Sequence, residues 1–190
     1  MGMTELLQVG LSSWIISDGN YKDFSVGDVR SFALEYYNED KLRPATEPSF
    51  RRYLGDARYA VAGSRLHLGG LSQHLTPTWC VIDVGVLAYR ELHQFDVPPD
   101  RFSGEVYLGV DHFSYFERLA HEADAPPLIY NWRVHRIEVE TAPRILKDGM
   151  WIYDPDKRGC ADVQETKGGE DFILHCERLP DLPQKRLVHT

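Results

Sequence analysis

The sequence predicts a mainly β protein of the α+β kind, built as an antiparallel β-barrel or a two-sheet sandwich with one helix packed against it. Three observations lead to this prediction. Most segments alternate apolar and polar residues with a period of two, which is typical of strands. One segment alone, at about 112–123, has apolar residues at helical spacing. A chain of 190 residues is long enough for one buried core and short for two, so we expect a single globular domain over residues 1–190.

The alternation begins at the N-terminus. The opening "MGMTELLQVGLSSWII" has no basic region before its apolar residues, so it is interpreted as a strand and not as a signal peptide. Further along, Phe32, Leu34 and Tyr36 share one face after a turn at Gly27, where we expect a positive φ. The next strand residues fall in "YAVAGSRLHLGG", which the final pair of glycines is expected to close.

The clearest strand is "TWCVIDVGVLAYRE", which is apolar on both faces and is therefore expected at the centre of a sheet. Asp83 interrupts it. A carboxylate among apolar residues either faces water or is buried with a hydrogen-bond partner, because isolated burial of charge is costly. In one interpretation Asp83 is an acceptor or general base in a ligand pocket lined by Trp79 and Tyr89, with Gly85 leaving room for close approach. The alternative, which we favour, pairs Asp83 with an arginine such as Arg133 or exposes it to solvent.

The stretch "GVDHFSYFERLAHEADAPP" predicts the helix at about 112–123. Asp111 is a suitable N-cap, aromatic and aliphatic side chains follow at helical spacing, and Ala-Pro-Pro ends the run. Glu117 and His121 share one face of this helix, whereas His112 points elsewhere. The two histidines lie nine residues apart, and the zinc motif HExxH requires four. We therefore predict a helix that plugs the barrel, no metal site and no cofactor.

The segment "LIYNWRVHRIEVE" changes the parity of its apolar residues between Val134 and Ile137. Such a change predicts a β-bulge near His135 and Arg136. Strands followed by one helix and further strands also match the order of OB-type barrels, in which the helix lies between the third and fourth barrel strands. A general barrel, an OB-like barrel and a sandwich thus all remain open.

Three segments lack a strand pattern. Residues 38–57 are interpreted as a long loop that could hold a short helix around residues 49–54. Residues 154–170 form a polar, glycine-containing loop. Residues 178–190 are expected to form a C-terminal tail, which could be flexible.

Composition narrows the function classes. A formal net charge of −8 repels phosphate backbones and anionic lipid, so nucleic acid is a disfavoured partner. No apolar run approaches the roughly 20 residues of a transmembrane helix, and we expect a cytoplasmic protein that does not enter a membrane. The three cysteines lack a CxxC pair, which indicates neither a disulfide framework nor a zinc finger. No GxSxG, Walker or GxGxxG motif is present.

Three functions remain, and the sequence does not predict the oligomeric state. The first, which we favour, is a non-enzymatic binding protein that holds a partner protein or a small ligand by its end loops and exposed aromatic side chains. The second is an enzyme centred on the Asp83 pocket. The third is a single-stranded nucleic-acid binder that uses the loop Phe50–Tyr59, where aromatic rings alternate with basic side chains, the set being Arg51, Arg52, Tyr53 and Arg58.

Overall fold

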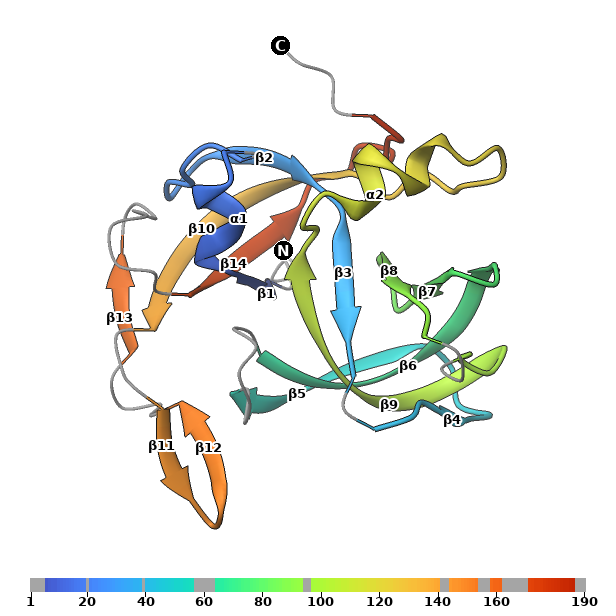
Figure 1. Ribbon diagram of the computed structural model, residues 1–190, viewed down its shortest axis with the longest axis horizontal. Helices are drawn as coiled ribbons and strands as arrows, with labels where there is room; N and C mark the ends of the chain where they lie inside the picture. The colour runs from blue at the N-terminus through green and yellow to red at the C-terminus, as the bar shows by residue number, and fades with distance from the viewer. Residues whose placement is uncertain are drawn as a thin grey trace, which may run out of the picture.

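The computed structural model describes most of the chain and is mostly strand, with 54% of residues in strands and 8% in helices (Figure 1). The described residues are 6–19, 21–38, 40–56, 64–93, 97–140, 144–153, 158–161 and 171–186. Within this part of the chain, no helix is both long and apolar enough to cross a membrane.

Five strands close into a β-barrel, which confirms the predicted fold class. Around the barrel, each strand pairs antiparallel with the next, except for one parallel pair between β3 and β8. Closure removes the unpaired edges that an open sheet would expose. The order is β3 (Leu34–Tyr37), β9 (Arg101–Val110), β6 (Ser64–Leu75), β7 (Trp79–Asp83) and β8 (Leu87–Glu91).

Strand β6 runs through the pair of glycines that was expected to end it. One edge of β6 pairs with β9 from Arg65 to Leu71, and on the other edge the partner changes from β5, whose pairing ends at Gly69, to β7, whose pairing begins at Leu71. A Cβ atom on Gly70 would lie 2.1 Å from the main-chain oxygen of Asp83. The glycine therefore allows the close approach of two backbones at this point of the barrel.

A second group of strands continues the sheet from β9 (Figure 1). The apolar faces of β1, β10 and β14 pack into the same core cluster as the barrel strands. The predicted β-bulge is confirmed, because the register of β10 against β14 shifts between Val134 and Arg136. The strands are β1 (Leu7–Leu11), β14 (Phe172–Arg178), β10 (Tyr130–Glu140), β2 (Val29–Phe32) and β13 (Arg158–Ala161).

Four further strands lie outside these two groups. β4 (Arg43–Pro44) pairs with β9, and β5 (Phe50–Asp56) pairs with β6. The hairpin of β11 (Arg144–Lys147) and β12 (Met150–Tyr153) projects from the rest of the molecule (Figure 1). The short helix suggested around residues 49–54 is wrong. The residues from Phe50 onward form strand β5, whose backbone pairs with β6.

The prediction of one central strand through Asp83 is also wrong, because the segment forms two strands joined by a tight turn. β7 and β8 turn back on each other around Gly85, whose φ is +89°, a value that suits glycine. The amide of Gly85 donates a hydrogen bond of 2.9 Å to Asp83 Oδ1. This bond between an aspartate side chain and the amide two residues later is an Asx-turn. The apolar residues on both sides of it concealed the hairpin in the sequence.

The predicted helix over 112–123 packs on the barrel as expected but is shorter than predicted. It consists of α2 (Ser114–Glu117) and the 3-10 turn η1 (Leu119–His121), which contribute Tyr115 and Leu119 to a second core cluster. Phe113, with φ +92°, directly precedes α2. Asp111, two residues earlier, caps this helix by accepting hydrogen bonds from the amides of residues 113 and 115. Because α2 follows β9, the last of the barrel strands along the chain, the structure does not support the OB-type order.

Two segments near the chain ends differ from what the sequence suggested. After β1, the chain forms a short helix α1 (Ser13–Ser17), where the sequence was interpreted as strand. Near the C-terminus, Gln184 and Ile129 exchange two backbone hydrogen bonds of 2.7 and 2.9 Å, which anchors the predicted tail at that point. The rest of the tail beyond residue 186 and most of the 154–170 loop lie outside the described residues.

Candidate functional site

The structure does not assemble the predicted Asp83 pocket. Trp79 and Tyr89 are fully buried, with ring centroids 6.4 Å apart, in the core cluster beneath α2. Trp79 Nε1 donates a 2.9 Å hydrogen bond to Glu122, and the Tyr89 hydroxyl donates to Asp111. These two side chains connect the end of the barrel to the helical segment.

Asp83 itself lies at the β7–β8 turn. Its Oδ1 accepts the Gly85 amide, and its Oδ2 lies 3.4 Å from Gln73 Nε2. No described histidine hydrogen-bonds to it. The expected partner Arg133 lies instead 3.8 Å from Glu177. The geometry therefore gives Asp83 a turn-forming role, and it adds no support to the enzyme hypothesis built on this residue.

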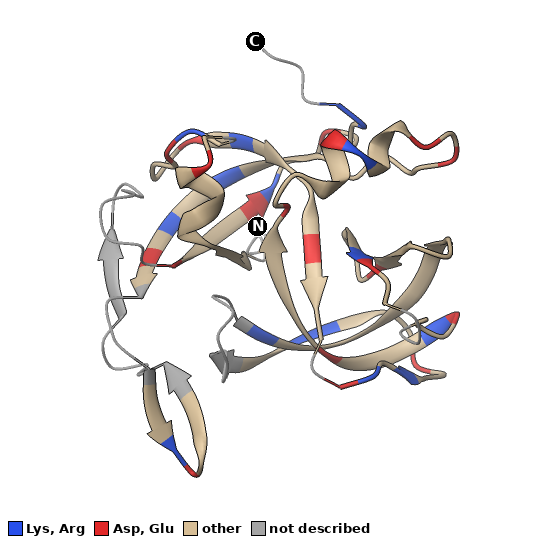
Figure 2. Cartoon of the chain, in the orientation of Figure 1, with Lys and Arg blue, Asp and Glu red and all other residues tan. Residues whose placement is uncertain are grey.

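The predicted nucleic-acid platform is placed on β5, apart from Arg58, which lies outside the described residues. Arg52 and Tyr53 are exposed, and Arg51 is half-buried beside the Gly85 turn. Successive residues of a strand point to opposite faces, so Arg52 and Tyr53 do not form one surface. Figure 2 shows basic residues spread over several strands with acidic residues among them.

A buried polar relay lies where β3 meets the end of β9. The side chain of Glu35 on β3, only 5% exposed, bonds through Oε2 to His112 Nδ1 at 2.5 Å. The other imidazole nitrogen, Nε2, lies 3.2 Å from Ser114 Oγ at the start of α2. The Tyr37 hydroxyl donates to the same Glu35 oxygen at 2.7 Å. Two segments of the chain, β3 and the stretch from His112 to Ser114, thus converge on one line of hydrogen bonds.

Asp111 lies next to this relay and is fully buried. Its Oδ1 accepts hydrogen bonds from the Tyr89 hydroxyl and from the amides of Phe113 and Tyr115, while its Oδ2 has no partner within the described chain. Burial raises the pKa of Asp111 to about 6, although the hydrogen bond from Tyr89 acts to lower it. The Asp111 side chain is therefore a second buried carboxyl group beside that of Glu35.

His112 is the part of the relay that solvent can reach. Its side chain is 30% exposed, and the half-exposed Trp14 ring of α1 lies 5.7 Å from it between centroids. The hydrogen bond to Glu35 raises the pKa of His112, against burial, which lowers it. The sequence analysis placed His112 on a helix, away from the face of Glu117 and His121, and gave it no partner. The missed signal was Glu35, a carboxylate between two buried strand residues, Leu34 and Tyr36.

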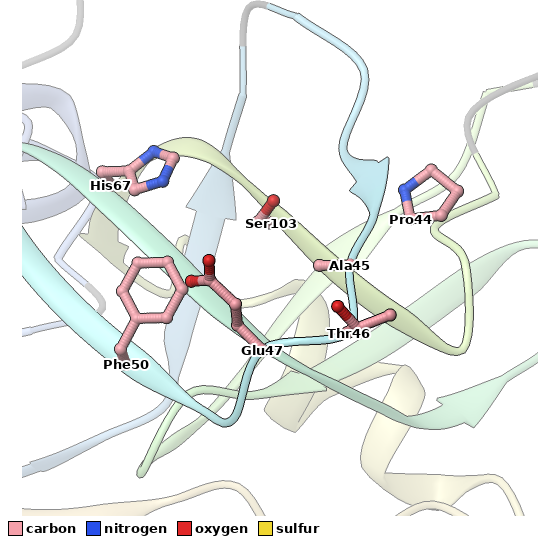
Figure 3. Close-up of a pocket in the computed structure, with 7 residues that line it drawn as sticks. All are labelled: Pro44, Ala45, Thr46, Glu47, Phe50, His67 and Ser103. Carbon is pink, nitrogen blue, oxygen red and sulfur yellow. The ribbon is translucent and has the colours of Figure 1, made fainter.

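An open pocket lies between the β4–β5 loop and strands β6 and β9 (Figure 3). Its volume is about 400 Å³. The rings of Phe50 and His67 lie 5.3 Å apart at 37° and form one wall. Figure 3 shows the Glu47 carboxylate reaching toward the Phe50 ring, with Ser103 beyond it. The lining residues are Pro44, Ala45, Thr46, Glu47, Phe50, His67 and Ser103.

The polar side chains of this pocket are unpaired. Within the described chain, Glu47, His67 and Ser103 make no side-chain hydrogen bond or ion pair. Glu47 is exposed, and His67 and Ser103 are half-buried. Because these polar groups converge on one open volume, they are available to a ligand that enters it. The sequence analysis singled out Phe50 for a stacking role but did not connect it with His67, since the β5–β6 register was not known.

The described residues contain no group of three or more His, Cys, Asp or Glu side chains that could hold a metal ion. The described thiols of Cys80 and Cys176 are free and buried. Comparison of the chain with known protein families, curated proteins and solved structures found no match.

Proposed function

We propose that this protein is a binding protein that takes an organic cation, an ammonium or guanidinium group, into the pocket between the β4–β5 loop and β6. The observation that carries the proposal is the unpaired Glu47 carboxylate beside the aromatic wall of Phe50 and His67. The cation can be a free amine or the Lys or Arg side chain of a partner protein. Both sources present the same chemistry to the pocket.

The pocket offers a cation two favourable interactions at once. A carboxylate attracts it directly, and the face of an aromatic ring within about 6 Å attracts it through the ring quadrupole. The hydroxyls of Thr46 and Ser103 can accept hydrogen bonds from its N–H groups. A volume of about 400 Å³ suits one small ligand or one long side chain.

The charge of the whole chain favours the same class of ligand. A net charge of −8 attracts cations over distances of about one Debye length and raises their rate of encounter. It repels phosphate and anionic lipid. The single-stranded nucleic-acid hypothesis and the Asp83 enzyme hypothesis have no comparable set of convergent side chains, so we do not adopt them.

Isothermal titration calorimetry with three ligands of one shape tests the proposal. Benzylammonium, benzyl alcohol and benzoate are cationic, neutral and anionic, and we expect affinity to fall in that order. Glu47→Gln keeps the shape and removes the charge, and it should weaken benzylammonium binding about tenfold, or about 1.4 kcal/mol, without affecting benzyl alcohol. Glu117→Gln, on the exposed side of α2, is the matched control and should change nothing.

A capped tripeptide with a central arginine distinguishes the two sources of the cation. Tighter binding of the peptide than of benzylammonium points to a partner protein, and the reverse order points to a free amine. Equal affinity for benzylammonium and benzoate, or unchanged binding by the Glu47→Gln variant, would contradict the proposal.

A further inference from the structure

We propose that Ser114, His112 and Glu35 form a serine-type hydrolytic relay that cleaves neutral carboxylic esters. This site is separate from the cation pocket and requires no occupant of that pocket. Ser114 is the nucleophile, His112 is the general base, and Glu35 is a positioning residue that acts through His112.

The order and spacing of the three groups carry the inference. Nucleophilic hydrolases place a hydroxyl within hydrogen-bond reach of a base, which a third group orients. Here Ser114 Oγ lies 3.2 Å from His112 Nε2, and His112 Nδ1 lies 2.5 Å from Glu35 Oε2. The buried carboxylate is held in turn by the Tyr37 hydroxyl at 2.7 Å. The spatial arrangement defines such a relay independently of sequence order.

The backbone between the two reacting groups is strained. Phe113 separates His112 from Ser114 and has φ +92°, which is an outlier for a bulky residue. Such a conformation is unfavourable and persists only where the surroundings hold it. The Phe113 amide bonded to Asp111 and the buried Phe113 ring do so here. This turn places Ser114 beside the Nε2 atom of His112.

Solvent and substrate can reach the relay from the α1 side. The His112 side chain is 30% exposed, and Trp14 is 50% exposed with its ring centroid 5.7 Å from the imidazole. The Trp14 ring can pack against an apolar or aromatic part of an ester. The Glu91 carboxylate near Ser114 is balanced by a 2.6 Å ion pair with Arg118. The apolar surface of Trp14 is therefore the feature that favours neutral esters.

The reaction balances without any cofactor. With His112 neutral, Nδ1–H donates to Glu35, and Nε2 accepts the Ser114 hydroxyl proton while Oγ forms a bond to the ester carbonyl carbon. Collapse of the tetrahedral intermediate breaks the bond to the alcohol oxygen, which leaves with the proton from Nε2. Water then attacks the acyl-serine, its proton passing through Nε2 back to Ser114 Oγ. The sum is ester plus water giving carboxylic acid plus alcohol.

Protonation of His112 turns the relay off. When both imidazole nitrogens carry protons, Nε2 can no longer accept the Ser114 hydroxyl proton. Because the Glu35 hydrogen bond raises the pKa of His112, hydrolysis should appear only as pH rises through that elevated pKa. The charges of Asp111 and of Glu91, which is paired with Arg118, also raise the pKa of His112, so Glu91→Gln should move the rising limb to lower pH.

The experiment combines a serine-directed probe with hydrolysis of p-nitrophenyl butyrate by the full chain. A fluorophosphonate should form one adduct on Ser114 of the wild-type protein at pH 8.5, located by peptide mass spectrometry. His112→Asn should slow both labelling and hydrolysis by about 100-fold or more, the usual contribution of a general base. Controls are Ser17→Ala, an exposed serine that bonds to Trp14, and His121→Asn on η1.

Labelling of wild-type Ser114 does not depend on whether any variant folds. An adduct on Ser114 that His112→Asn slows and His121→Asn does not, with a pH profile shifted by Glu91→Gln, supports the relay. Absence of a Ser114 adduct in the folded wild-type protein, an adduct on another serine only, or labelling that is equally fast in His112→Asn overturns it.

Discussion

The two polar sites of this protein differ in how far their side chains are already bonded. Around Glu35, Asp111 and His112, side chains from strands far apart in sequence bond to one another, and most of them are buried. In the pocket, Glu47 and Ser103 face an open volume and bond to nothing in the described chain. Buried donors that are already paired contribute to stability, whereas unpaired convergent groups are available to a ligand. Substitution of the buried Asp111 should therefore lower stability, and substitution in the pocket should lower binding.

The largest expected effect is loss of stability on Asp111→Ala. The change removes the acceptor of three buried donors, namely the Tyr89 hydroxyl and the amides of Phe113 and Tyr115. Leaving several buried donors unpaired should lower the free energy of unfolding by about 3–5 kcal/mol. Urea denaturation at pH 5 measures it.

The matched control is Asp111→Asn, which keeps an oxygen acceptor of the same reach. We expect it to cost about 1 kcal/mol or less at the same pH. A loss as large as that of the alanine variant would mean that the carboxyl group is needed for its charge or its proton and not for the hydrogen bonds described here.

The second effect is on the pH dependence of stability. The pKa of Asp111 rises from 3.8 to about 6 on folding, mainly through burial. A raised carboxyl pKa means that the folded state binds the proton more tightly, so the stabilisation is complete below about pH 4 and is lost as pH rises through 6. The size is about 3 kcal/mol. Compared with Asp111→Asn, wild-type protein should lose roughly that much between pH 4 and pH 7. Parallel curves for the two proteins would contradict a raised pKa.

The third effect concerns ligand binding in the pocket, with only a small loss in the free energy of unfolding. A Cβ at Gly69 would lie 2.6 Å from the Phe50 ring, which can swing away. Gly69→Ala should therefore push the ring into the pocket, weaken benzylammonium binding several-fold and cost only about 1 kcal/mol. Gly70→Ala is the contrast, because its Cβ would meet a main-chain oxygen at 2.1 Å, and it should destabilise the barrel instead. Unchanged affinity of the Gly69 variant would remove Phe50 from the binding site.

The regular parts of the fold were predictable from local patterns. A period of two predicted strands and a mainly β barrel, the change of parity after Val134 located the bulge, and Gly27 has φ +92° as its turn required. The hairpin at Gly85 was missed because strands buried on both faces read as one long apolar run. The length of the helix was overestimated, because the aromatic side chains that suggested it pack across the end of the barrel. Part of their spacing comes from the turn at Phe113 and not from a regular helix.

The sites were less predictable than the fold, for a physical reason. Asp83 and Glu35 give the same signal, a carboxylate inside an apolar strand, yet one lies at a turn and the other is buried against His112. Only the pairing of β3 with β9 brings Glu35 to a histidine 77 residues away. The pocket depends in the same way on β5 and β6, which place Phe50 opposite Gly69. Register between distant strands is set by the whole barrel and not by local sequence.

The most direct test of the contrast between the two sites follows both histidines in one sample. Long-range ¹H–¹⁵N NMR of the imidazole rings, with benzylammonium added at constant pH, reports on the pocket through His67 and on the relay through His112. We predict that the His67 resonances move in a saturable way, while those of His112 stay fixed and show a proton on Nδ1 held by Glu35. Fixed His67 resonances, or equal movement of both rings, would contradict the assignment of the pocket as the cation-binding site.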